Sequence, residues 1–330
     1  MKYCLFVSLR DDDAIARFDI DHGVPEKRVD FGLEGGPAPM VINAQKTCIF
    51  AGLRKSNELV CLRVGADAGL SFAARASLPS DPCFIGLDKS GEFVFTAYYG
   101  AGQIAVHRWD EKEGKLTETQ RISTEKNAHS VWLDPTERYV YVPHTGPNKI
   151  YLYVLDKLSG TLLPRTPPWF SYDDYKEPRH LCFHPSKNYF YAVNEGSSTL
   201  SVFLYNRENG TIELKQTVST LPGPHTENKT AEIRITPDGR HLYASNRGHN
   251  SISCYKISDD TGSVEFLACT SAPAVPRSFD ISPDGNFLYA AGQDTGELAT
   301  FTIEQNTGTL KELSGIPIGR CPIWVMAAAM

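Results

Sequence analysis

Residues 235–248 read ITPDGRHLYASNRG, and residues 281–294 read ISPDGNFLYAAGQD. Each stretch holds the end of one apolar run, a polar turn and a second apolar run, which is the pattern of two strands joined by a tight turn. Four further stretches superimpose on these two without gaps: INAQKTCIFAGLRK (42–55), LDKSGEFVFTAYYG (87–100), LDPTERYVYVPHTG (133–146) and FHPSKNYFYAVNEG (183–196). The chain is therefore built from an internal repeat.

One turn residue in each unit, called here the turn marker, gives the period of the repeat. The markers are Ala44, Lys89, Pro135, Pro185, Pro237 and Pro283, at intervals of 45 to 52 residues. An aromatic residue follows each marker by six positions: Phe50, Phe95, Tyr141, Tyr191, Tyr243 and Tyr289. Each unit also holds four short β-like runs, such as RHLCF, NYFYAVN, TLSVFLYN and TIELKQTVS in the fourth unit, and none has helical periodicity. Four strands in a unit of this length are typical of a β-propeller blade.

The two ends of the chain supply a seventh blade. Six complete units account for residues 37 to about 318, which leaves the C-terminal run PIWVMAAA and the N-terminal segment YCLFVSLRDDDAIARFDIDHGVPEKRVDF. Pairing of the N-terminal strands with the C-terminal strand would leave no open edge between the first and last blades. We therefore expect one all-β domain over residues 1–330, a seven-bladed propeller with four-stranded blades. Residues 164–176 and 222–229 are rich in turn-forming residues and are expected to be loops.

Composition excludes several functions. The formal net charge is -6 and no block of Lys or Arg occurs, which argues against nucleic-acid binding. No apolar stretch approaches the roughly 18 residues of a membrane span, and YCLFVSL is too short before RDDD to be a signal peptide, so we interpret it as a strand. The eight cysteines form no C-x-x-C motif, which favours reduced thiols in a cytoplasmic protein. We expect a monomer or a weak homodimer.

Differences between the repeats point to a site. Six and five residues before the turn marker, and nine and ten residues after it, the polar choices gather in the third to sixth units. Because the first two strands of a blade are antiparallel neighbours, the start of one and the end of the other lie at the same end of the sheet. First strands line the channel of a propeller, so these positions should surround one pocket. The residues are His129, His144, Arg179, His180, Asn194, Glu195, Glu232, Asn246, Arg247, Arg277 and Gln293.

The chemistry of this set favours binding of an anion. Several arginines at one channel mouth repel one another unless an anion or the glutamates compensate. A structural ion pair between Arg179 and Glu195 is the alternative reading, since charged residues at strand ends are usually solvated. No metal-ligand motif occurs: His180 and His184 are four apart on a strand, about 13 Å, which is too far to share an ion. No G-x-S-x-G motif or obviously activated cysteine supports nucleophilic catalysis.

The motifs PRHLCFHP…YAVNE, IRITPDGRHLYASNR and PRSFDISPDGNFLYAAGQ resemble the seven-bladed propeller lactonase family, from PMVINAQK through GRCPIWV. That family includes bacterial 6-phosphogluconolactonases, to which the similarity is closest, and fungal 3-carboxy-cis,cis-muconate lactonizing enzymes. The resemblance implies a metal-free and cofactor-free pocket acting on a small acidic lactone. It places the functional residues on His129 (NAHS), Arg179 (PRH), Glu195 (VNE) and Arg247 (SNR). In TAEIRITPDG, Glu232 stands where the bacterial lactonases tend to carry Asp, which leaves the shape of the substrate open.

The resemblance implies hydrolysis of 6-phosphoglucono-1,5-lactone, a step of the pentose phosphate pathway. Arg179 or Arg247 would stabilise the oxyanion, and Glu195 or His129 would take a proton from the attacking water. Arg277 is the best candidate to hold the phosphate, with the remaining residues of the set lining the substrate pocket. Three alternatives stay open: another acidic lactone such as an aldarolactone, a lactonizing cycloisomerase, and a propeller that binds a ligand without catalysis.

Overall fold

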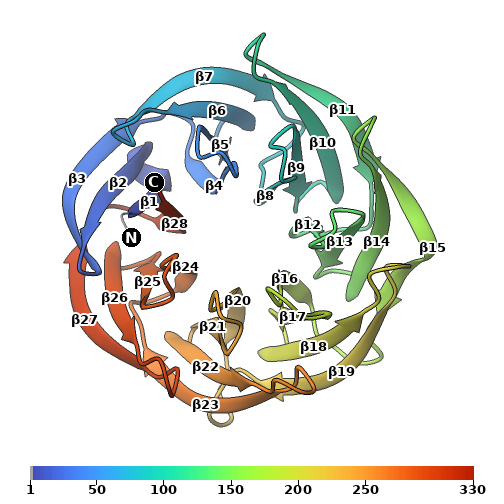
Figure 1. Ribbon diagram of the computed structural model, residues 1–330, viewed down its shortest axis with the longest axis vertical. Coiled ribbons are helices and arrows are strands. Elements are labelled where there is room, and N and C mark those ends of the chain that lie inside the picture. Colours follow the sequence, from blue (N-terminus) through green and yellow to red (C-terminus); the bar gives the residue numbers. More distant parts are fainter. Residues whose placement is uncertain (1–2) are drawn as a thin grey trace. The chain divides into compact units, whose positions relative to one another are not determined.

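The computed structural model describes residues 3–330, which form seven four-stranded antiparallel sheets (Figure 1). Residues 1 and 2, included above in the single domain, lie outside the described residues. The described part of the chain divides into two compact units: residues 3–30 with 178–330, and residues 31–177. That all 330 residues form one domain stays a prediction. No helix among the described residues is long and apolar enough to cross a membrane.

The first unit holds four sheets (Figure 1). Three follow the chain in order. The first of these is β16 (Pro178–Phe183), β17 (Tyr189–Asn194), β18 (Thr199–Tyr205) and β19 (Ile212–Ser219). The second is β20 (Lys229–Ile235), β21 (His241–Arg247), β22 (Ser251–Ile257) and β23 (Val264–Ser271). The third is β24 (Pro276–Ile281), β25 (Phe287–Gly292), β26 (Glu297–Ile303) and β27 (Leu310–Pro317).

The fourth sheet of this unit joins the two ends of the chain. Its order is β28 (Pro322–Ala329), β1 (Tyr3–Leu9), β2 (Ala14–Asp21) and β3 (Val24–Gly32), with one short 3-10 turn, η1 (Arg10–Asp12), between β1 and β2. Strand β1 pairs with β28 from Tyr3↔Ala329 to Leu9↔Pro322. The predicted pairing of the N-terminal strands with the C-terminal strand is therefore confirmed, as is the reading of YCLFVSL as a strand.

The second unit holds three sheets in chain order. The first is β4 (Pro37–Ile42), β5 (Cys48–Leu53), β6 (Glu58–Val64) and β7 (Leu70–Ser77). The second is β8 (Phe84–Leu87), β9 (Phe93–Tyr98), β10 (Gln103–Asp110) and β11 (Lys115–Ser123). The third is β12 (Trp132–Leu133), β13 (Tyr139–His144), β14 (Lys149–Asp156) and β15 (Thr161–Ser171).

The repeat also fixes the register of the strands. The residue four before the turn marker pairs with the residue seven after it in five sheets: Met40↔Ala51, Ile85↔Thr96, Leu181↔Ala192, Ile233↔Ala244 and Phe279↔Ala290. In the third unit the neighbouring pair, Trp132↔Tyr141, has the same register. The six stretches superimpose without gaps because their first two strands pair in the same register. A slip of one residue would turn every side chain of a strand to the other face of the sheet.

The aromatic residue of the repeat ties successive sheets together. Tyr191 donates a hydrogen bond to the carbonyl of Gly262 at 3.0 Å, Tyr243 to that of Gly308 at 2.6 Å, and Tyr289 to that of Gly23 at 2.9 Å. Each acceptor is a turn glycine of the next sheet with positive φ, between 65° and 84°, a conformation that glycine adopts without steric cost. A buried hydroxyl group that makes a hydrogen bond costs little free energy to bury. The tyrosine at this position of the repeat therefore packs in the core and also links its sheet to the next one.

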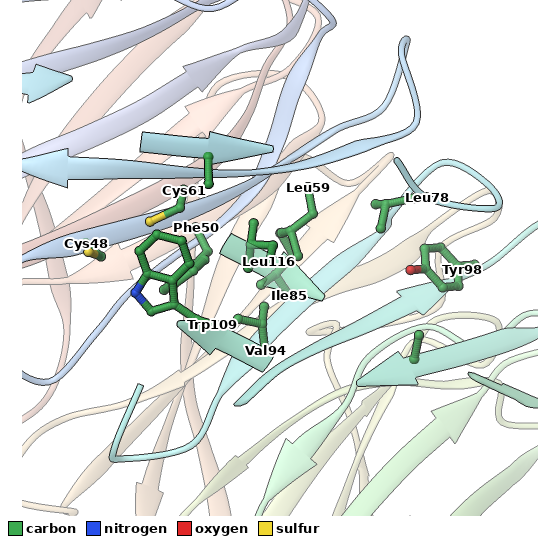
Figure 2. Close-up of a cluster of buried hydrophobic side chains, with 12 residues drawn as sticks. Cys48, Phe50, Leu59, Cys61, Leu78, Ile85, Val94, Tyr98, Trp109 and Leu116 are labelled. Carbon is green, nitrogen blue, oxygen red and sulfur yellow. The ribbon is translucent and has the colours of Figure 1, made fainter. Parts of the chain in front are cut away.

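The hydrophobic core lies between neighbouring sheets. In the second unit, Phe50 meets Trp109 edge-on at 5.8 Å between ring centroids, beside the buried Cys48 and Cys61 (Figure 2). In the first unit, Val193 and Leu200 pack with Ile233 and Leu242. Because these apolar side chains fill the space between the sheets, the ends of the strands are left for polar groups.

One predicted loop is wrong in part. Residues 164–171 of the 164–176 insert belong to β15, which pairs with β14 through an irregularity between Tyr151 and Tyr153. Prolines 164, 167 and 168 are tolerated there because β15 is the last strand of its sheet, where a missing N–H costs no ladder hydrogen bond. The 222–229 insert is a loop up to Asn228, and Lys229 begins β20.

Candidate active site

Four strands of the first unit bring polar side chains to one end of two sheets. Arg179 lies near the start of β16, Glu195 directly follows β17, Lys229 begins β20 and Arg247 ends β21. Both first strands carry a register irregularity there, between Pro178 and His180 and between Thr230 and Ile233. Such bulges change the direction of side chains and are frequent beside active sites. Strands β16 and β20 are neighbours, so the four side chains can meet.

The carboxylate of Glu195 is the centre of this group, called here the Glu195 cluster (Arg179, Glu195, Lys229 and Arg247). Its Oε2 lies 3.2 Å from Nε of Arg179, and its Oε1 lies 3.1 Å from Nη2 of Arg247. The ammonium of Lys229 lies 4.0 Å from the same Oε1. Arg179 also donates to the carbonyl of Ala231 on β20. The ion pair between Arg179 and Glu195, which the sequence analysis gives as the structural alternative, is therefore present, and a role of these residues on a substrate stays a prediction.

The surroundings of Glu195 keep it ionised. Burial raises the pKa of this carboxyl, but the positive charges of Arg247 and Arg179, with a smaller effect from Arg277, outweigh burial and lower the pKa below its ordinary value. The side chains of Glu195 and Arg247 are each 13% exposed, and that of Arg179 is 3% exposed. A bound molecule could therefore reach Glu195 and Arg247 more easily than Arg179.

A second group of charges lies deeper along the first strands and is called here the Arg234 cluster (His180, Glu232, Arg234 and Asp280). Oε1 of Glu232 is 3.0 Å from Nδ1 of His180 and accepts from Nη1 of Arg234 at 2.6 Å. Nε of Arg234 donates to Oδ1 of Asp280 at 3.0 Å, and Oδ2 of Asp280 accepts from the backbone N–H of Ala327 at 2.9 Å. The chain of contacts therefore crosses β16, β20, β24 and β28, the first strands of four sheets.

Burial and charge set the protonation of the Arg234 cluster. Burial, and then the charge of Arg179, lower the pKa of His180 to about 4, so its imidazole is neutral at pH 7. Burial opposes ionisation of Glu232, but Arg234 and His180 outweigh it and lower the pKa to about 2. Burial raises the pKa of Asp280 despite the attraction of Arg234. With neutral His180, its Nδ1–H donates to Glu232, which fixes the tautomer.

Three residues of the sequence-derived set make hydrogen bonds to nearby strands and strand ends. The amide of Asn194 donates to Thr199 and Ser201 at 2.9 Å each, and that of Asn246 donates to Thr220 and Ser253 at 2.9 Å each. His144 is fully buried, with Nδ1 3.0 Å from the carbonyl of Val142 and Nε2 2.8 Å from Thr124, and burial lowers its pKa to about 4. These contacts stabilise the strand ends, and the predicted role of the three side chains in substrate binding stays a prediction.

The other predicted residues occupy different surroundings. Arg277 is half-buried on β24, close enough to Glu195 to contribute to its lowered pKa. Gln293 is half-buried beyond β25 and donates to Asp294 at 3.4 Å. His129 is buried in the second unit, with its ring 5.5 Å from that of Tyr99, and its backbone N–H donates to Pro143 at 3.0 Å. Its catalytic role stays a prediction.

Arg234, Asp280 and Lys229 were missed by the comparison of repeats. Arg234 and Asp280 both stand three residues before the turn marker, where the other units carry Val41, Gly86, Trp132 and Cys182. Because alternate residues of a strand share a face, Arg234 points to the same side as Glu232. Extending the comparison by one alternate position would have found both residues.

Within residues 3–330, no three His, Cys, Asp or Glu side chains are grouped so as to hold a metal ion. In the Glu195 cluster two guanidinium groups and one ammonium group surround a single carboxylate, an arrangement that attracts anions.

Comparison with known proteins agrees with the sheets and their number. The family described as "Lactonase, 7-bladed beta-propeller" matches residues 31–326. A 6-phosphogluconolactonase from Enterobacter sp. (strain 638) is 34% identical over 298 residues, which are 89% of this chain and 89% of that protein. The chain belongs to the seven-bladed β-propeller lactonase family. This lactonase is thus an all-β protein of seven four-stranded antiparallel blades and a homologue of carboxylic ester hydrolases.

Solved structures share the fold of this lactonase at low identity. The periplasmic gluconolactonase of Pseudomonas aeruginosa is 21% identical with a TM-score of 0.91, over 100% of this chain and 99% of that one. A candidate 6-phosphogluconolactonase from Bacteroides fragilis NCTC 9343 is 21% identical with a TM-score of 0.90, over 99% of this chain and 98% of that one. At such identity the similarity concerns the fold, and the chemistry has to be argued from the residues of this lactonase.

Proposed function

We propose that this lactonase hydrolyses 6-phosphoglucono-1,5-lactone to 6-phosphogluconate, and that the Glu195 cluster is its active site. The observation that carries the proposal is one ionised carboxylate held between two arginines, with a lysine and Arg277 close by. An excess of cations around a single carboxylate suits an anionic substrate. The 34% identity to a 6-phosphogluconolactonase supports the same substrate.

Attack of water on the ring carbonyl develops a negative charge on its oxygen. A fixed guanidinium stabilises that oxyanion strongly because it needs no reorganisation during the reaction. Arg247 is the better placed donor, since its side chain is more exposed than that of Arg179. Arg179, between Glu195 and the carbonyl of Ala231, would hold the carboxylate in position.

Glu195 is the proposed general base. It is ionised at neutral pH, and the arginines that lower its pKa also make it a weak base. A weak base suffices for a six-membered aldonolactone, whose carbonyl is reactive. His129 is the alternative base implied by the family resemblance, because an imidazole can accept a proton near pH 7.

The cations around Glu195, Arg277 among them, would hold the substrate phosphate by charge-assisted hydrogen bonds. The same positive charges oppose binding of a metal ion, so we propose that catalysis is independent of metal. We further propose that the protein acts in the cytoplasm in the pentose phosphate pathway. All eight cysteines are free thiols, which fits a reducing compartment.

A panel of lactones tests this proposal. Purified protein is expected to hydrolyse 6-phosphoglucono-1,5-lactone with a higher kcat/KM than glucono-1,5-lactone or an aldarolactone, and to keep its rate in excess chelator. The measurement is acid release at constant pH, with spontaneous hydrolysis subtracted. A preference for the aldarolactone would assign a different acidic lactone, and loss of activity in chelator would overturn the metal-free mechanism.

A further inference from the structure

Lys229 is fixed at the active-site end of its sheet by backbone pairing. It is the first residue of β20 and is the register partner of Arg247, the last residue of β21. Nε of Arg247 donates to the backbone carbonyl of Lys229 at 3.3 Å. The backbone of Lys229 is therefore held beside Arg247. The comparison of repeats did not identify Lys229.

The side chain of Lys229 is the most accessible cation of the Glu195 cluster. It is 65% exposed, against 13% for Arg247 and 3% for Arg179. Its ammonium lies 4.0 Å from Oε1 of Glu195, an oxygen already bound by Arg247 at 3.1 Å. An exposed ion pair at this distance contributes little to stability, so the ammonium is free to exchange this contact for a better one.

The charges around Glu195 leave room for a strong anion. In the described part of the first unit, one carboxylate contacts Arg179, Arg247 and Lys229 and lies near Arg277. Glu232 and Asp280 share Arg234, and the charge of Arg179 also acts on Glu232, so three carboxylates stand against five cations when these residues are included. A phosphate monoester carries about -1.5 to -2 at pH 7 and matches the excess, whereas glucono-1,5-lactone carries no charge.

Position also favours Lys229 as the phosphate ligand. The lactone carbonyl must reach the guanidinium of Arg247, the proposed oxyanion donor, whose side chain is more buried than that of Lys229. The phosphate of a 6-phosphoaldonolactone is at the far end of the molecule from that carbonyl, so it points toward the exposed side of the cluster. Lys229 is the cation on that side.

We propose that Lys229 binds the phosphate of the substrate and sets the preference of the enzyme for phosphorylated over unphosphorylated sugar acids and their lactones. The inference rests on the proposed function, because it places the reacting carbonyl at Arg247 and Glu195. It adds a residue that determines specificity without taking part in the chemical step.

The test is calorimetric titration of 6-phosphogluconate and gluconate into wild-type protein, Lys229→Met and Lys229→Arg. Lys215→Met is the matched control, since Lys215 is an exposed lysine paired with Glu213 on β19. Lys229→Met is expected to raise the Kd of 6-phosphogluconate roughly tenfold, the effect of one lost charged hydrogen bond at an exposed site. The Kd of gluconate should stay within about twofold, Lys229→Arg should retain most of the affinity, and Lys215→Met should leave both constants unchanged.

An unchanged Kd for 6-phosphogluconate in Lys229→Met, or an equal weakening of both ligands, would overturn the inference. The titration decides on Lys229 whether or not the protein turns over a lactone, and the lactone panel decides separately on hydrolysis. Binding of 6-phosphogluconate that depends on Lys229, without hydrolysis of its lactone, would keep the phosphate contact and reject the proposed reaction.

Discussion

Replacement of Glu195 by glutamine is expected to lower kcat/KM for lactone hydrolysis by about 10²- to 10⁴-fold, the usual contribution of a general base. Glutamine has nearly the same shape but cannot accept the proton of the attacking water. It also removes the negative charge that now lies 3.2 Å from Arg179 and 3.1 Å from Arg247. We therefore expect a loss in kcat, with thermal stability measured in parallel to show that the variant is folded.

Glu213→Gln is the matched control for this substitution. Glu213 lies on β19 of the same sheet, is 66% exposed and pairs with Lys215. Its replacement should leave kcat and KM unchanged. Retention of full activity by Glu195→Gln would assign the base to another residue, with His129 the first candidate.

The acid side of the pH profile distinguishes the two bases. Because the pKa of Glu195 is lowered, its carboxylate persists as the pH falls from 7 through the ordinary glutamate range near 4.3. With Glu195 as the base, kcat/KM of the wild-type enzyme should stay level as the pH falls from 7 to about 5.5, for as long as the protein is folded. A histidine base of ordinary pKa would instead lose activity as the pH falls through about 6.5.

Arg234→Met is expected to lower the free energy of unfolding by about 3 kcal/mol at pH 7, the lower end of the cost of removing one partner from a buried ion pair, because Arg234 is itself 20% exposed. Glu232 is fully buried and has Arg234 at 2.6 Å, and Asp280 has it at 3.0 Å. Methionine would fill part of the space but leave both acids without the guanidinium. The urea dependence of unfolding measures this loss.

The pH dependence of the stability lost in Arg234→Met follows from the pKa of Glu232. In the wild-type protein this pKa is lowered to about 2, so the stability it contributes is complete above the ordinary glutamate range and is lost as the pH falls toward 2. The variant lacks that contribution, so the difference between the two proteins should hold above the ordinary glutamate range and shrink as the pH falls from about 4 toward 2. Arg240→Met is the control, because Arg240 is 49% exposed and pairs with Asp238 at the surface. A loss no larger than the roughly 1 kcal/mol of a surface pair would contradict the structural role of Arg234.

Most of the fold follows from the sequence because strand register is a local property of each repeat. The spacing between turn marker and aromatic residue, as at Pro237 and Tyr243, reflects a backbone pairing that is the same in every unit. The extent of β15 was not predictable in the same way. Prolines in a sequence normally indicate a loop, and only the position of β15 at the edge of its sheet makes them compatible with a strand.

The sequence predicts which strand ends carry the polar residues of the site, but it does not predict the direction in which each side chain points. Arg179, Glu195 and Arg247 meet as the repeat comparison indicates. Asn194 and Asn246 occupy the same slots, yet their short amides are captured by hydroxyl groups within their own sheets. A comparison of repeats identifies which positions share an end of a sheet, whereas hydrogen-bond competition decides where each side chain points.

The most direct test is a crystal structure of the protein with 6-phosphogluconate bound. The carboxylate end of the product should lie within hydrogen-bond distance of Arg247 and beside Glu195, with the phosphate within reach of the Lys229 ammonium. Product bound elsewhere, for example in the pocket of about 580 Å³ lined by Gly196, Pro224 and His225, with the Glu195 cluster unchanged, would contradict the assignment of the active site.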